Sequence, residues 1–146
     1  MNSMMLTALR LLTQREYSRQ ELTKRLQQQF SEAEVEVVVR ECIEKKLLSD
    51  ERFLESRIQH RISQGYGPQW IRQDLQSHQI DKELVAEMLA FDDDYWIEQA
   101  SQLIARKYKN KDLKQHQQKL QRYLFQRGYS VAVIQKTLKR MLNVID

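Results

Sequence analysis

The chain has few of the residues that interrupt regular secondary structure. Its 146 residues include only 3 glycines and 1 proline, too few for the many tight turns of a β-sandwich or β-barrel. Apolar residues make up 41% of the chain and charged residues 30%. This is too much apolar content for a disordered segment and too much charge in every window for a membrane span. Its abundant Gln, Leu, Lys, Arg and Glu favour helices, so we expect a soluble all-α protein.

The sequence also lacks the patterns that carry common catalytic and cofactor chemistry. Three glycines cannot supply a phosphate-binding loop. The histidines, His60, His78 and His116, have no second His or Cys at the i+3 or i+4 spacing of a zinc site. The acidic run Asp92–Asp94 falls at a predicted helix start, where carboxylates favour the helix dipole, so we interpret it as a cap rather than a cation site. We expect no catalytic activity, no cofactor and no metal.

The single cysteine, Cys42, cannot form an internal disulfide. It falls on an apolar helical stripe, which predicts a buried thiol in a reducing compartment. The N-terminal MNSMMLTALRLL has no basic start, no continuous apolar stretch and no A-x-A cleavage site. We therefore expect a mature cytoplasmic protein that has no contact with a membrane.

The small net charge of +4 hides a strong asymmetry along the chain. Residues 1–99 contain 13 Lys+Arg and 18 Asp+Glu, a net charge of −5. Residues 100–146 contain 11 Lys+Arg and only 2 acidic residues, Asp112 and Asp146, a net charge of +9. A basic third attached to an acidic two-thirds indicates a surface for nucleic acid or acidic protein at the C-terminal end, the alternative being a solvated lysine-rich helix surface.

Apolar spacing and capping residues predict about nine helices. The β-branched run Val37–Val39 could be taken for a strand, but its charged flanks favour a helix. Gly65 is expected to end one helix, Pro68 to start the next, and Gly128 to end a later one. Two of the expected caps, Ser18 and Ser31, are followed by Glu three residues on, as in a capping box. The full set of expected caps is Ser18, Ser31, Asp50, Asp81 and Ser130.

Apolar positions recur at a period of 49 residues. The matching sets are Leu22, Ile71 and Leu120; Leu26, Leu75 and Leu124; and Val35, Leu84 and Val133. Tyr17 and Tyr66 also match. We predict three tandem three-helix repeats, at residues 1–49, 50–91 and 92–146. Because each is too small to hold much core alone, we expect them to pack end to end in an elongated, slightly curved array.

Four ordered segments resemble the RecX family, the regulatory proteins that restrain the RecA recombinase. These segments are Ala8-Leu9-x-x-Leu12 with Arg15-Glu16-Tyr17-Ser18-x-x-Glu21-Leu22-x-x-Arg25-Leu26; Leu47-Leu48-Ser49-Asp50-Glu51-Arg52-Phe53; Gly65-Tyr66-Gly67-Pro68-x-x-Ile71-x-x-x-Leu75; and Leu124-Phe125-x-Arg127-Gly128-Tyr129-Ser130. The chain departs from the family pattern at Lys46 and Gln79, where the family often has Gly, and at Leu54, where it often has Ala.

The resemblance implies a monomer that lies in the groove of the RecA–single-stranded DNA filament. It would contact more than one RecA protomer, with weak or indirect contact to the DNA. It would obstruct filament extension, ATPase, strand exchange and co-protease activity, which belong to DNA recombination, DNA repair and the SOS response. The family has no catalytic residues to carry over.

Candidate contact residues come from the basic groups. They are Arg106, Lys107, Lys109, Lys111, Lys136, Lys139 and Arg140 in the last third, with a weaker group of Arg57, Arg61 and Arg72. Solvation and a favourable charge near a helix C-terminus are the alternative for the cluster at 106–111. Tyr66 and Trp70 are candidate aromatic contacts; packing on its own repeat is favoured for Tyr66, and core anchoring is equally open for Trp70.

Two other functions compete with regulation of RecA. A basic three-helix unit could bind DNA directly as a helix-turn-helix module, although the acidic first two-thirds disfavour this. A generic helical adaptor is the other alternative. Adaptor repeats of the TPR or HEAT type usually use two helices, which argues against it.

Overall fold

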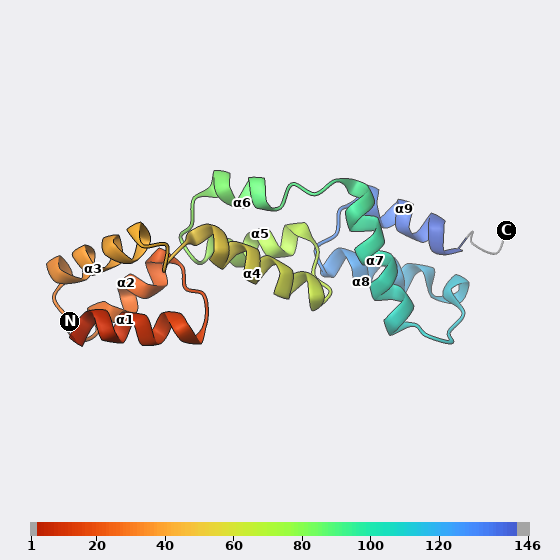
Figure 1. Cartoon of the computed structure of the whole chain (residues 1–146). Coiled ribbons are helices and arrows are strands. Elements are labelled where there is room, and N and C mark those ends of the chain that lie inside the picture. Colours follow the sequence, from red (N-terminus) through yellow and green to blue (C-terminus); the bar gives the residue numbers. More distant parts are fainter. Residues whose placement is uncertain (1–2, 143–146) are drawn as a thin grey trace. The chain divides into compact units, whose positions relative to one another are not determined.

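The computed structural model describes residues 3–142 and is helical without strands over that range (Figure 1). Its elements are α1 (Ser3–Gln14), α2 (Arg19–Gln27), α3 (Glu32–Glu44), α4 (Asp50–Ser63), α5 (Pro68–Gln76), α6 (Lys82–Met88), α7 (Asp93–Lys107), a 3-10 turn η1 (Leu113–His116), α8 (Gln117–Gln126) and α9 (Val131–Leu142). The all-α prediction of tandem three-helix repeats is confirmed. Within residues 3–142, no helix has both the length and the apolar content needed to cross a bilayer. Asp146, one of the two acidic residues of the last third, lies outside this range.

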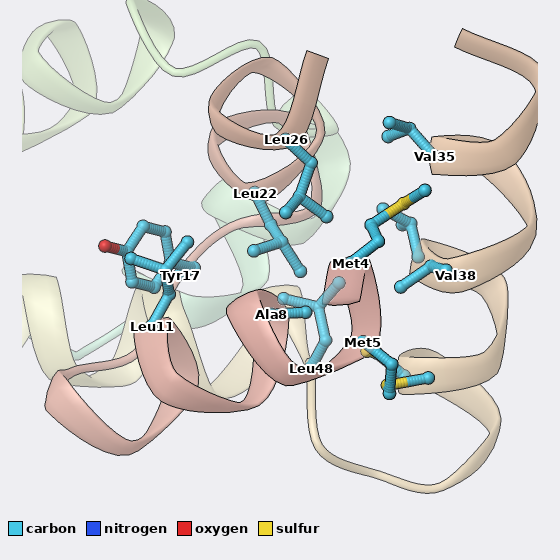
Figure 2. Close-up of a cluster of buried hydrophobic side chains, with 12 residues drawn as sticks. Met4, Met5, Ala8, Leu11, Tyr17, Leu22, Leu26, Val35, Val38 and Leu48 are labelled. Carbon is cyan, nitrogen blue, oxygen red and sulfur yellow. The ribbon is translucent and has the colours of Figure 1, made fainter. Parts of the chain in front are cut away.

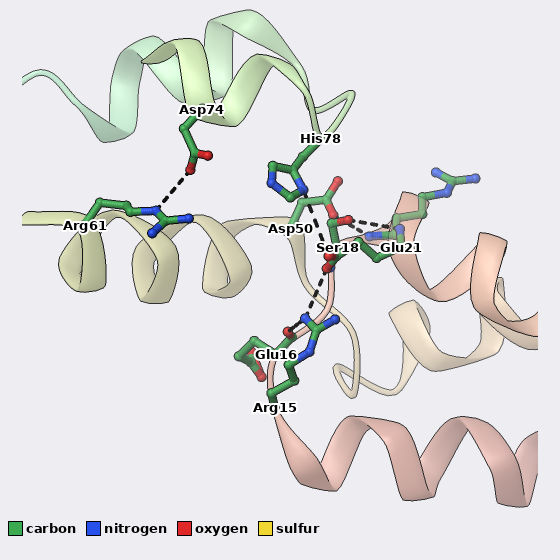
Figure 3. A network of polar contacts seen from close by, with 9 residues as sticks. Arg15, Glu16, Ser18, Glu21, Asp50, Arg61, Asp74 and His78 are labelled. Carbon is green, nitrogen blue, oxygen red and sulfur yellow. Dashed lines mark hydrogen bonds and ion pairs between the residues drawn. The ribbon is translucent and has the colours of Figure 1, made fainter. Parts of the chain in front are cut away.

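Most helix starts follow the predicted capping. Ser18 Oγ accepts the N–H of Glu21 at 3.0 Å, and the Glu21 carboxylate accepts the N–H of Ser18 at 3.2 Å, which completes a capping box (Figure 3). Asp81, Asp92 and Ser130 accept backbone N–H groups at the starts of α6, α7 and α9. Asp92 therefore acts as a helix cap, as the sequence predicted.

The predicted cap at Asp50 is wrong, and the one at Ser31 holds for position only. Ser49, not Asp50, caps α4: its Oγ accepts the N–H of Arg52 at 3.3 Å. The Asp50 carboxylate accepts the N–H of Arg19 at 2.7 Å instead, so a contact distant in sequence competes with the local one. Ser31 stands at the start of α3 with an extended backbone but makes no side-chain cap hydrogen bond.

The first repeat packs its three helices around one apolar core. Figure 2 shows side chains from α1, α2 and α3 converging, and the valine run lies inside the helix α3, as predicted. Cys42 is buried in this core, and burial raises the pKa of its thiol, with the nearby Glu41 carboxylate adding to the rise. The core residues are Met4, Met5, Ala8, Leu11, Tyr17, Leu22, Leu26, Val35, Val38, Val39, Cys42 and Leu48.

The 49-residue period coincides with the buried positions in all three repeats. Leu22, Ile71 and Leu120 each have 0% of their surface exposed, and Leu26, Leu75 and Leu124 have at most 1%. The third set differs in the middle repeat, where Val85 is buried and the predicted Leu84 is only half-buried. The short helix α6 is therefore rotated by about one residue, roughly 100°, from the predicted register.

Contacts group the chain into two compact units. The first contains the chain up to Arg57 together with Leu75–Val85, and the second contains Ile58–Asp74 together with the chain from Ala86 onward. In the second unit, α9 packs on both α7 and α8, and η1 lies against α8 and α9. The middle repeat thus contributes residues to both units, as expected for repeats that pack against their neighbours.

Two departures from the family pattern carry left-handed backbone. Lys46 has φ of 61° and Gln79 has φ of 54°. A side chain at such a φ costs roughly 1–2 kcal/mol relative to ordinary helical backbone, a cost that glycine avoids. Gln79 lies 49 residues before Gly128, which has φ of 98°. The equivalent residue after the second helix of a repeat is therefore left-handed in two repeats, as Gln79 in the middle repeat and as Gly128 in the third.

Candidate partner-binding surfaces

A backbone junction in the second unit joins the turn before α5 to the turn after α8. The N–H of Gly67 donates to the Arg127 carbonyl at 2.7 Å, and the N–H of Gln69 donates to the Gly128 carbonyl at 3.0 Å. The two glycines allow this approach. A Cβ on Gly67 would lie 2.7 Å from the Gly128 carbonyl carbon, and one on Gly128 would lie 2.5 Å from the Trp70 backbone N. Their role is close packing within the unit.

The predicted aromatic contacts, Tyr66 and Trp70, lie in this junction. Their rings stack with centroids 3.6 Å apart, and the guanidinium of Arg127 covers the Tyr66 ring at 3.9 Å. Arg127 also donates hydrogen bonds to the carbonyls of Gln64 and Gly65. Tyr66 therefore packs on Trp70 of its own repeat while both rings stay half-buried. This role of Arg127 was not predicted, although its position directly before the helix-ending Gly128 was a signal in the sequence.

The predicted cluster at the end of α7 lies on the surface. Arg106, Lys107, Lys109 and Lys111 are all exposed, on the last turn of α7 and the loop to η1. Lys107 Nζ lies 4.2 Å from the Tyr123 ring centroid, and Lys111 Nζ lies 5.7 Å from the Tyr108 ring centroid. Aromatic rings hold these ammonium groups near the surface without neutralising their charge.

Two of the three basic residues of α9 form ion pairs with α7. Lys136 Nζ lies 3.7 Å from the Asp93 carboxylate, and Arg140 donates to Glu98 at 2.9 Å, so both charges face acids of α7. Hydrogen bonds from Gln102 and Arg140 lower the pKa of the Glu98 carboxyl. Lys139 is exposed. The two ion pairs reduce the positive charge that α9 offers to a partner.

The predicted basic group of the middle repeat does not form one patch. Arg61 Nε lies 3.2 Å from the Asp74 carboxylate (Figure 3), its Nη1 donates to Gln64 Oε1 at 2.8 Å, and its guanidinium lies 5.4 Å from the Trp70 ring. Arg57 is half-buried, and Arg72 is exposed on α5. Arg61 therefore serves the packing of its own unit.

The other polar residues weighed as ligands have structural neighbours. His78 Nδ1 lies 4.0 Å from the Glu21 carboxylate (Figure 3). The centroid of the His78 ring lies 5.6 Å from that of Phe53, and all three residues belong to the first unit. Over the part of the chain that the structure describes, no group of three or more His, Cys, Asp or Glu residues is placed to hold a metal ion.

A groove of mixed apolar and polar lining lies between α8 and α9, and it was not among the predicted sites. Phe125 is 61% exposed and Val131 is 58% exposed, and both line a groove of about 520 Å³. Phe125 directly follows the buried Leu124, so it lies about 100° around the helix from the core stripe. That offset was the signal in the sequence. The lining is Gln118, Gln121, Arg122, Phe125, Val131, Ile134 and Gln135.

Comparison with known proteins identifies RecX domains in all three repeats of the chain. The first, second and third three-helix domains described for RecX match residues 5–42, 49–89 and 93–138. A regulatory protein RecX from Legionella pneumophila is 41% identical over 138 residues, covering 92% of each chain. One from Serratia proteamaculans is 34% identical and covers 92% of this chain and 95% of its own.

Solved structures show the same fold. The crystal structure of RecX from Lactobacillus salivarius matches with a TM-score of 0.79 at 21% identity, covering 94% of this chain and 93% of its own. A second crystal structure of regulatory protein RecX matches with a TM-score of 0.72 at 23% identity, covering 92% of this chain and 72% of its own. With three domain matches in order and relatives above 30% identity across its length, this chain belongs to the RecX family.

Proposed function

We propose that this protein is a non-enzymatic regulator that binds the RecA–single-stranded DNA filament. Bound there as a monomer, it inhibits filament extension, ATP hydrolysis, strand exchange and co-protease activity. It acts in DNA recombination, DNA repair and the SOS response in the cytoplasm. The observation that carries this proposal is the ordered match of three RecX domains to residues 5–42, 49–89 and 93–138.

The charge distribution supports a docked orientation. The exposed cluster Arg106, Lys107, Lys109 and Lys111 gives the third repeat a positive surface, whereas residues 1–99 are net negative. Opposite potentials on two partners speed their encounter and fix their orientation more than they add affinity. This cluster, with Lys139 and Arg72, therefore forms the proposed polar contact with the filament. Arg57, Arg61, Lys136 and Arg140 are weaker contact candidates because each is half-buried or ion-paired in the unit.

The direct test measures RecA ATPase on single-stranded DNA with increasing amounts of this protein. We expect inhibition at micromolar concentrations and loss of strand exchange over the same range. An ATPase rate that stays unchanged removes the proposed function. A parallel titration of naked DNA separates direct DNA binding, which predicts tight binding with a steep dependence on salt.

Charge reversal tests the proposed contact cluster. Lys107, Lys109 and Lys111 are replaced together by Glu, and we expect inhibition to require at least roughly tenfold more protein, because like charges then face the same partner surface. The matched control reverses three exposed basic residues of the first unit, Lys24, Arg25 and Lys82. Unchanged inhibition by the folded triple variant rejects the cluster as the contact and leaves the function standing.

A further inference from the structure

The α8–α9 groove exposes more apolar surface than the packing of its own repeat requires. Leu120 and Leu124 of α8 are fully buried, so the helix is already anchored without Phe125. Phe125 and Val131 nevertheless present two large apolar side chains, 61% and 58% exposed, to the same groove. Two large apolar side chains exposed in one groove, among polar neighbours, make it a candidate interaction site.

The charged residue of the groove lining is basic. Arg122 is the charged residue of its lining, and the sequence from Leu113 to Leu142 contains no acidic residue. Lys119 is exposed on α8 three residues before Arg122, which places the two charges on the same side of the helix. A groove that exposes Phe125 and Val131 beside basic side chains complements a segment that carries an apolar residue together with carboxylates.

The lining favours a protein segment over nucleic acid. Sites for single-stranded DNA align several aromatic platforms along a track of positive charge. This groove has one aromatic ring, one cation and two branched aliphatic residues, Val131 and Ile134. Branched side chains shape a pocket for an aliphatic or aromatic side chain, and the three glutamines of the lining can hydrogen-bond a peptide backbone.

We propose that the α8–α9 groove docks an acidic segment of the protein subunits of the filament. An apolar side chain of that segment inserts between Phe125 and Val131, and a carboxylate beside it pairs with Arg122. This proposal rests on the proposed function and deepens it. The filament would contact the protein at two sites, the apolar anchor in this groove and the basic cluster at the end of α7. Phe125 is the anchor, because buried aromatic residues at the centre of an interface carry most of its energy.

The test measures binding of the full chain to RecA filaments assembled on immobilised oligo(dT) with a non-hydrolysable ATP analogue. We expect Phe125→Ala and Arg122→Glu each to weaken binding roughly tenfold to a hundredfold, as for removal of an interface anchor. The matched controls are Leu6→Ala, an apolar residue 54% exposed on α1, and Arg25→Glu, an exposed arginine on α2. Both should bind as the wild type does. Because Phe125 and Arg122 are exposed, thermal unfolding of both variants should match the wild type.

Each alternative has its own readout. Wild-type affinity of both Phe125→Ala and Arg122→Glu overturns the groove while the proposed function survives. Equal weakening of their binding to bare oligo(dT) assigns the groove to DNA and also overturns it. Self-association of the wild type that Phe125→Ala abolishes, seen by sedimentation, assigns it to a second copy of the chain. A wild type that binds no filament overturns the groove and the proposed function together.

Discussion

Replacing Gly128 by alanine should destabilise the second unit selectively. A Cβ at this position would lie 2.5 Å from both the Cβ and the backbone N of Trp70, and Gly128 has φ of 98°. Backbone atoms cannot yield as the end of a flexible side chain can. The substitution should therefore force apart the hydrogen bond from the Gln69 N–H to the Gly128 carbonyl, 3.0 Å in the native junction.

The expected cost combines two effects that a second variant separates. Left-handed backbone costs roughly 1–2 kcal/mol for a residue with a side chain, and overpacking costs about 1–3 kcal/mol. The lower conformational entropy of the unfolded alanine variant offsets about 0.4–1 kcal/mol of this loss. The net loss in free energy of unfolding for Gly128→Ala is thus about 1–5 kcal/mol. Gly67→Ala meets Gly128 backbone at 2.7 Å without a left-handed φ, so it should show the steric part alone.

The chain offers a separate probe for each unit. Both of its tryptophans, Trp70 and Trp96, lie in the second unit, and Cys42 lies in the core of the first. Urea unfolding followed by tryptophan fluorescence should show the loss in Gly128→Ala. Reactivity of the Cys42 thiol over the same titration should show a smaller shift. A fluorescence midpoint equal to that of the wild type refutes the argument that the two glycines hold this junction together.

Further predictions concern single residues. Gln79→Gly and Lys46→Gly should each raise the free energy of unfolding by about 0.5–1 kcal/mol, because relief of left-handed strain exceeds the added unfolded-state entropy. A lower free energy of unfolding in urea titrations would contradict this. The Tyr129 hydroxyl is buried with no hydrogen-bond partner among residues 3–142, so Tyr129→Phe should stabilise the protein by up to about 1 kcal/mol in the same assay. Burial raises the pKa of Tyr129 above its ordinary value of 10.0. The unfolded state therefore loses the phenolic proton first, and the wild type should lose stability relative to Tyr129→Phe as the pH rises above that value. Native Cys42 should react with a thiol reagent only at the rate of unfolding, since its surface is 0% exposed and its pKa is raised; fast labelling under native conditions would disprove the burial.

Local chemistry made much of the fold predictable. The scarcity of glycine and proline, the 3.6-residue spacing of apolar side chains and the capping box at Ser18 depend on residues close in sequence. The 49-residue period then placed equivalent buried residues such as Leu22, Ile71 and Leu120 in three repeats. At one failed prediction a distant partner had intervened: Asp50 accepts the Arg19 N–H, and Ser49 caps α4 instead.

The sequence alone determined the helical class, the repeat and the family, because these follow from spacing along one chain. Only the tertiary structure decided which charges remain available to a partner. It pairs Lys136 with Asp93 and Arg140 with Glu98, and it places the Arg127 guanidinium over the Tyr66 ring. It also leaves Phe125 exposed beside Val131. Ion pairs, ring stacks and grooves join side chains from different helices, and their distances are set by packing, which no local pattern in the sequence encodes.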